Sequence, residues 1–90
     1  MPEETLFEFE QTMSRAEVAR YLRTLAKHLE KDGSINFTAG TRESTVEVPA
    51  RVEFEIEVER ETEEGKPAEM SIELEIEWTE GEEDASLQIS

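Results

Sequence analysis

The chain has 90 residues with 24 acidic and 9 basic side chains, a formal net charge of −15 and no cysteine. This length allows one domain with a modest core, but not a core together with a deep catalytic cleft. The composition excludes disulfides, thiolate metal sites and cysteine nucleophiles, and no apolar run reaches the 18 residues of a membrane span. Residues 1–4 are acidic where a secretory signal would be apolar, so we expect a cytoplasmic protein.

The acidity indicates a salt-rich solvent. Glu outnumbers Asp by 22 to 2 and Lys occurs three times. The Debye length falls from about 10 Å at 0.1 M salt to about 3 Å at 1 M, so self-repulsion that weakens a compact state in dilute buffer is largely screened in concentrated salt. The apolar residues are periodic, which favours a folded halophilic protein over a disordered one.

Residues 6–10 alternate between apolar and acidic side chains and predict a first strand. A helix over 14–32 follows, with Ser14 and Glu17 at capping-box spacing and Gly33 at the position of a C-terminal glycine. The apolar stripe of this helix is regular at helical period and comprises Val18, Tyr21, Leu22, Leu25 and Leu29.

Beyond the helix the period changes to two residues. Short strands are predicted at 34–38 and 45–48, separated by a turn over 40–44. Two longer strands follow at 51–60 and 68–79, joined by a polar turn. One face of each long strand is apolar and the other is lined by glutamate, as in an antiparallel sheet with one wet face.

These elements predict an α+β fold of order β-α-β-β-β-β. We expect an antiparallel sheet of four to five strands with one helix packed on one face. Residues 1–80 would form a single domain, and residues 81–90 an acidic tail expected to be flexible.

The pattern resembles the amphi-Trp domain family of archaea and bacteria, particularly its haloarchaeal members. The residues that carry the resemblance are the helix opening at 14–19, the segment 21–26, the alternation over 52–59, and the amphipathic strand 72–77 followed by Trp78. The resemblance implies the same α+β fold and brings with it no catalytic residues.

Two charged surfaces are predicted. Arg20, Arg23, Lys27 and Lys31 form a basic stripe opposite the apolar one on the helix. It is interpreted first as a solvated surface near the negative end of the helix dipole. Contact with an anion or with nucleic acid is the less favoured alternative, because the net charge opposes it. The glutamate face is likewise interpreted first as hydrated, with docking of a basic partner or weak cation binding as alternatives.

The apolar face of the two long strands is the candidate interface. One helix is about 10 Å across and covers about two strands spaced roughly 4.8 Å, so a sheet of four or five strands would remain partly uncovered. A second copy, packed sheet against sheet or helix against sheet around a two-fold axis, would cover it; ligand binding beneath the helix is the less favoured use of the same surface. The candidate interface residues are Phe54, Ile56, Leu74, Ile76 and Trp78, with Trp78 equally compatible with a core position.

No catalytic apparatus is evident. His28 is the single histidine and lies at the border of the apolar stripe, so no metal site can be completed around it. The four glycines are dispersed and form no phosphate loop. We therefore expect no enzyme function and no cofactor. The favoured hypothesis is a non-catalytic interaction or structural module acting as a homodimer; the alternative is a regulator that binds a basic protein or nucleic acid through its charged faces.

Overall fold

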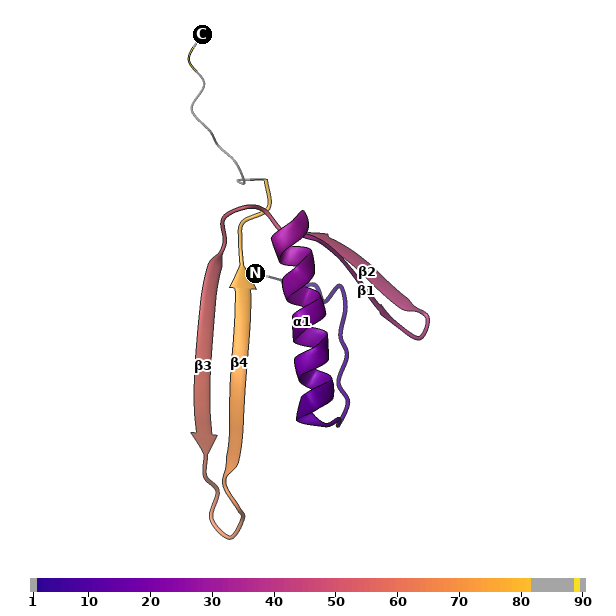
Figure 1. Cartoon of the computed structure of the whole chain (residues 1–90). Coiled ribbons are helices and arrows are strands. Elements are labelled where there is room, and N and C mark those ends of the chain that lie inside the picture. Colours follow the sequence, from indigo (N-terminus) through magenta and orange to yellow (C-terminus); the bar gives the residue numbers. More distant parts are fainter. Residues whose placement is uncertain (1, 82–88, 90) are drawn as a thin grey trace. The chain divides into compact units, whose positions relative to one another are not determined.

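The computed structural model describes residues 2–81 and 89, and these have an α+β composition (Figure 1). Two compact units divide the chain, Met1–Val48 and Pro49–Ser90. The strands form two separate antiparallel sheets of two strands each, β1–β2 in the first unit and β3–β4 in the second. In chain order the elements are α1 (Arg15–Lys31), β1 (Ser34–Ala39), β2 (Arg42–Glu47), β3 (Glu53–Glu61) and β4 (Glu69–Glu77).

Helix α1 begins at the predicted capping box. The backbone N–H of Glu17 donates to Ser14 Oγ at 3.1 Å, and the Glu17 carboxylate accepts from the Ser14 backbone at 3.4 Å. Two of the N–H groups that a helix start leaves without intrahelical partners are thereby satisfied. The start of the helix is therefore encoded locally, as the sequence predicted.

The end of α1 depends on Gly33. Its φ of +75° lies in the left-handed region, and its N–H donates to the carbonyl of His28 at 2.9 Å, closing the last turn. The Gly33 carbonyl accepts from the N–H of Val48 at 2.8 Å. A Cβ at position 33 would clash with the Val48 carbonyl oxygen, so glycine is required both for conformation and for space.

Strands β1 and β2 form a hairpin around the two-residue loop Gly40–Thr41. Gly40 has a φ of +61°, which suits the tight turns that match strand twist. The predicted turn over 40–44 is thus too long, because residues 42–44 already belong to β2. Helix α1 packs against β1, and Ile35 of that strand is the one buried apolar side chain among the described residues.

The predicted first strand at residues 6–10 is absent from the structure. This segment is joined to the hairpin by side chains instead of a strand ladder. The rings of Phe7 and Phe37 lie 5.7 Å apart between centroids, and Arg42 Nη1 donates to the Glu8 carbonyl at 3.3 Å. Alternation describes which side chains share a face, but a strand also needs a neighbour for its backbone groups.

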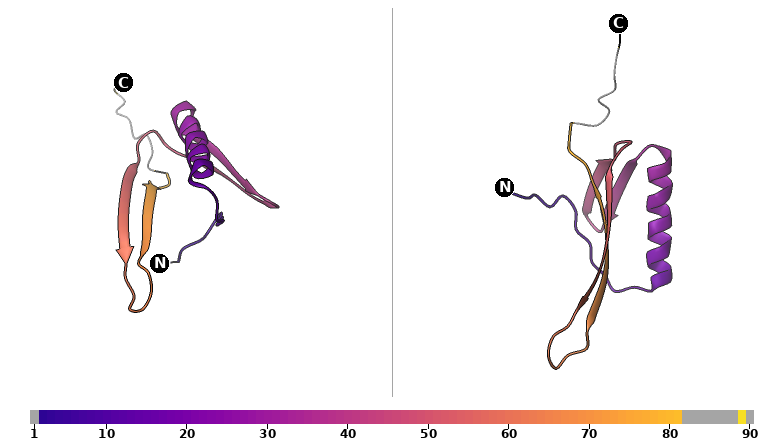
Figure 2. Two further views of the ribbon diagram at one scale, coloured as in Figure 1. Left: turned by 60° about the horizontal axis from the view of Figure 1, so that its bottom comes forward. Right: turned by 90° about the vertical axis from the view of Figure 1, so that its left-hand side faces the viewer.

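The second unit is a long hairpin whose register is set by its alternation. Phe54 is opposite Ile76, and Ile56 is opposite Leu74. The right-hand view of Figure 2 shows this hairpin nearly edge-on, as a ribbon one strand layer thick. No further helix or strand belongs to this unit among the described residues.

The predicted single sheet of four to five strands is therefore wrong. Each strand pairs only with the strand next to it in sequence, β1 with β2 and β3 with β4, so the two sheets are separate. That residues 1–80 form one domain stays a prediction. Most of the predicted tail 81–90 lies outside the described residues. No helix in the described part of the chain is long and apolar enough to cross a membrane.

Candidate interaction surfaces

The apolar face of the β3–β4 hairpin brings four of the five candidate interface residues together. Phe54 and Ile76 form one cross-strand pair, and Ile56 and Leu74 form the next. The pair Val58 and Ile72 extends the same face. Phe54 is 62% exposed and Ile72 is 73% exposed. The hairpin thus presents a continuous apolar surface that no helix or strand among the described residues of its own unit covers; we call it the hairpin face.

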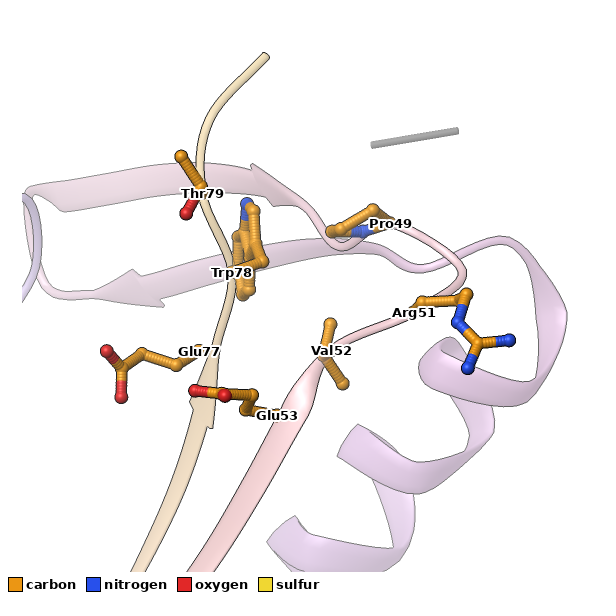
Figure 3. A pocket seen from close by; sticks show the side chains of 7 residues that line it. All are labelled: Pro49, Arg51, Val52, Glu53, Glu77, Trp78 and Thr79. Atoms are coloured by element: carbon orange, nitrogen blue, oxygen red, sulfur yellow. The ribbon is translucent and has the colours of Figure 1, made fainter. Parts of the chain in front are cut away.

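Trp78, the fifth candidate, lies just beyond the last residue of β4 and is half-buried. It lines a hollow of about 440 Å³ together with Pro49, Val52 and Thr79. Figure 3 shows the indole beside Val52, with the carboxylates of Glu53 and Glu77 extending together away from it. Trp78 therefore continues the hairpin face at its end, where the chain enters and leaves the hairpin.

The opposite face of the hairpin is acidic. Four cross-strand pairs place glutamate opposite glutamate. Three lie in the centre of the hairpin and at the end away from its turn, and the fourth lies beside the turn: Glu53–Glu77, Glu55–Glu75, Glu57–Glu73 and Glu61–Glu69. The glutamate face of the hairpin therefore consists largely of like-charge pairs. Such pairs are destabilising, so the face depends on screening by the solvent.

Crowding on this glutamate face alters protonation. A hydrogen bond with the carboxyl group of Glu59, and then repulsion from its charge, raises the pKa of Glu57. The same two causes, from Glu77, raise the pKa of Glu75. Both groups are therefore protonated at a higher pH than an isolated glutamate, which relieves part of the repulsion on the face.

Helix α1 carries the predicted basic stripe. Its four members, Arg20, Arg23, Lys27 and Lys31, are all exposed. The one ion pair between described side chains lies elsewhere, in the β3–β4 turn, where Lys66 Nζ is 3.6 Å from Glu63. The stripe is thus a set of cations available to solvent or to a partner.

The described residues hold no group of three or more His, Asp or Glu side chains placed to bind a metal ion. His28 is exposed in the last turn of α1, and its carbonyl caps that turn. The glutamates of the hairpin stand along a strand and do not converge on one point, unlike the six to eight oxygens around Ca²⁺.

The structure contains the features on which the family resemblance rests: a capped helix, an amphipathic hairpin and a tryptophan at the end of that hairpin. The Amphi-Trp domain family matches residues 1–90, the whole chain. The chain belongs to the Amphi-Trp domain family. No curated protein and no solved structure matches it.

The first unit of this Amphi-Trp domain carries a second apolar surface, which the sequence did not reveal. A groove of about 810 Å³ lies between the N-terminal segment, the first half of α1 and the end of β1. We call it the aromatic groove; Phe7, Phe9, Met13, Tyr21, Leu22 and Phe37 are among the residues that line it. Tyr21 is 59% exposed, so the groove is open to solvent.

The groove was missed because its residues come from three separate segments. The alternation of Phe7 and Phe9 was interpreted as a strand, and Tyr21 and Leu22 as part of a helix stripe covered by the sheet. In the structure, α1 has no buried residue at all. The signal that could have revealed the groove is the number of aromatic side chains in residues 1–48, which is larger than one small unit can bury.

Proposed function

We propose that this Amphi-Trp domain is a non-catalytic interaction or structural module that acts as a homodimer in a salt-rich cytoplasm. The observation that carries the proposal is the hairpin face, which stays uncovered by any helix or strand in the described part of its own unit. Phe54, Ile56, Leu74, Ile76 and Trp78 form the centre and one end of the proposed interface.

The hairpin requires such cover to be stable. An isolated two-stranded hairpin is at best marginally stable in water and needs further strands or a helix against its apolar face. Strands of nine residues are about 30 Å long. The face therefore measures on the order of several hundred Å², which approaches the roughly 800 Å² that each partner contributes to a standard interface. Exposed apolar patches of this size mark interaction sites.

Charge determines the conditions under which two copies associate. Each copy carries a formal charge of −15, so association is opposed in dilute buffer and favoured when the Debye length is short. Packing through the hairpin face directs the glutamate face outward to the solvent. The interface is thus apolar, and the repulsive groups remain hydrated.

The proposal is tested by adding one negative charge to either face of the hairpin. Ile56→Glu places a carboxylate within the proposed interface, whereas Ser71→Glu, the matched control, places it on the glutamate face opposite Glu59. In about 2 M KCl we expect I56E to raise the dimer dissociation constant about 30-fold or more, the effect of losing about 2 kcal/mol at an interface centre. The constant of S71E should remain close to that of the parent chain. Equal constants for all three chains, measured by sedimentation equilibrium, would refute the hairpin face as the interface.

A second candidate function rests on the exposed basic stripe of α1. A regulator could contact a polyanion through this stripe, although the net charge opposes the approach. The test compares the parent chain with the triple variant R20E/R23E/K27E for binding to a double-stranded DNA fragment, at the lowest salt concentration at which circular dichroism shows α1 folded in both chains. Loss of binding in the variant would favour this function. Absence of binding by both chains would remove it.

A further inference from the structure

The proposed homodimer leaves undecided which surface of the partner receives the hairpin. We infer that the hairpin face of each copy packs on the aromatic groove and apolar helix stripe of the other copy, so that the two copies exchange hairpins reciprocally. This inference rests on the proposed function and names the receiving surface.

The number of apolar surfaces exposed to water favours this arrangement. Each copy has two, the hairpin face and the aromatic groove with its helix stripe. Two hairpin faces packed against each other would leave both grooves exposed, including Phe9 at 52% and Leu22 at 43%. Reciprocal packing of hairpin on groove covers all four surfaces of a dimer. Since soluble proteins rarely leave large apolar patches open, the reciprocal arrangement is favoured.

Helix α1 and the β3–β4 hairpin match in length and width. A helix of 17 residues is about 26 Å long, and strands of nine residues are about 30 Å long. The helix is about 10 Å across, which corresponds to two strands spaced about 4.8 Å. Tyr21 and Leu22 of the apolar stripe remain exposed although α1 packs against β1. One helix therefore suffices to cover one two-stranded hairpin of the partner copy.

The distribution of charge also favours this arrangement. On α1 the basic stripe of Arg20, Arg23, Lys27 and Lys31 lies opposite the apolar stripe, and the glutamate face lies opposite the hairpin face. Packing hairpin on helix gives a layered arrangement with an acidic outer surface on one side and a basic one on the other. Packing hairpin on hairpin gives two acidic outer surfaces and no attraction between layers. Opposite charges favour the first arrangement to the extent that the salt leaves them unscreened.

The chain contains no cysteine, which makes site-directed cross-linking a clean test. One copy carries Leu22→Cys in the aromatic groove, and a size-tagged copy carries Leu74→Cys at the centre of the hairpin face. The two are unfolded, mixed and refolded in concentrated KCl, then treated with a short bis-maleimide reagent. We expect the mixed cross-linked dimer as the main product, because the groove of one copy faces the hairpin of the other.

Matched controls place the cysteine on the opposite side of the same element. Arg23→Cys replaces Leu22→Cys on the basic side of α1, and Ser71→Cys replaces Leu74→Cys on the glutamate face. Either replacement should abolish the mixed product. Circular dichroism of each variant in the same buffer verifies that α1 is retained.

The outcomes separate the two proposals. A dimeric mass in which L74C links to L74C, or in which no mixed product forms, overturns the reciprocal arrangement and leaves the homodimer in place. A monomeric mass, with L22C and L74C of a doubly substituted chain linked within that one chain, overturns both.

Discussion

The two units of the chain differ in charge and in the cover available to their hairpins. Residues 1–48 hold nine acidic and six basic side chains, whereas residues 49–90 hold 15 acidic and three basic ones. The β1–β2 hairpin packs against α1 and has Ile35 buried. The β3–β4 hairpin has no helix within residues 49–81, the continuous part of its unit that the structure describes. The acidity is thus concentrated on the part of the chain for which we propose a partner and a dependence on salt.

Each unit carries its own spectroscopic probe. The single tryptophan, Trp78, lies in the second unit, and α1, the one helix of the described residues, lies in the first. Fluorescence therefore reports on the hairpin face, and far-ultraviolet circular dichroism reports on α1. The following predictions use this pair of signals, from the largest expected effect to the smallest.

The largest effect should come from removing salt. Dilution from about 2 M to about 0.05 M KCl lengthens the Debye length several-fold, and we expect the hairpin to unfold, with a red shift of Trp78 emission. The helix signal should be lost in the same transition, because a helix of 17 residues deprived of its apolar cover is marginal.

The matched charge variants sharpen this prediction. E55Q/E73Q removes two charges from the glutamate face and should lower the KCl midpoint, whereas E3Q/E4Q removes two from the first unit and should leave it nearly unchanged. Equal shifts would mean that total charge governs folding, and the contrast between the two units would then be irrelevant to salt dependence.

The next effect concerns the end of α1. Gly33→Ala forces alanine into the left-handed region, which costs about 1–2 kcal/mol, and adds a Cβ against the Val48 carbonyl. Gly40→Ala has the same conformational cost, but its Cβ would contact no other atom. We expect the G33A loss of unfolding free energy to exceed that of G40A by at least about 1 kcal/mol, measured by urea unfolding in concentrated KCl. Equal losses would show that the contact of Gly33 with Val48 is not maintained in solution.

A smaller effect is expected at the start of the helix. Ser14→Ala removes the acceptor of the Glu17 N–H and should cost about 1 kcal/mol, read from the helix signal during urea unfolding. Ser14→Asp keeps an acceptor and should restore most of the loss. If S14D behaves like S14A, the capping box does not contribute to the stability of the first unit.

The smallest effect is a pH dependence that originates in the second unit. Because the pKa values of Glu57 and Glu75 are raised in the folded hairpin, the folded state binds more protons than the unfolded state just above pH 4.3, approximately the ordinary value for glutamate. Stability therefore increases as pH falls from 7 toward 5. The KCl midpoint of the Trp78 transition should decrease accordingly, and E57Q/E75Q should flatten this dependence. A midpoint that increases on acidification would contradict the sign.

The sequence predicted the locally encoded features well. The capping box of Ser14 and Glu17, the helix end at Gly33 and the two long amphipathic strands joined by a polar turn are all present, because each depends on neighbouring residues or on a strict period of two. Pairing between distant strands was not predictable, since alternation does not identify the neighbour of a strand. The aromatic groove escaped prediction for a related reason: Phe7 and Phe37 meet only through tertiary packing.

The most direct test of the account is the native mass of the unmodified chain in about 2 M KCl, measured by light scattering behind a sizing column. One copy has a mass of 10.3 kDa, and the account predicts a species of twice that mass which dissociates or unfolds when the salt is diluted. A folded species of 10.3 kDa, stable in both high and low salt, would contradict it, since the hairpin face would then need no second copy.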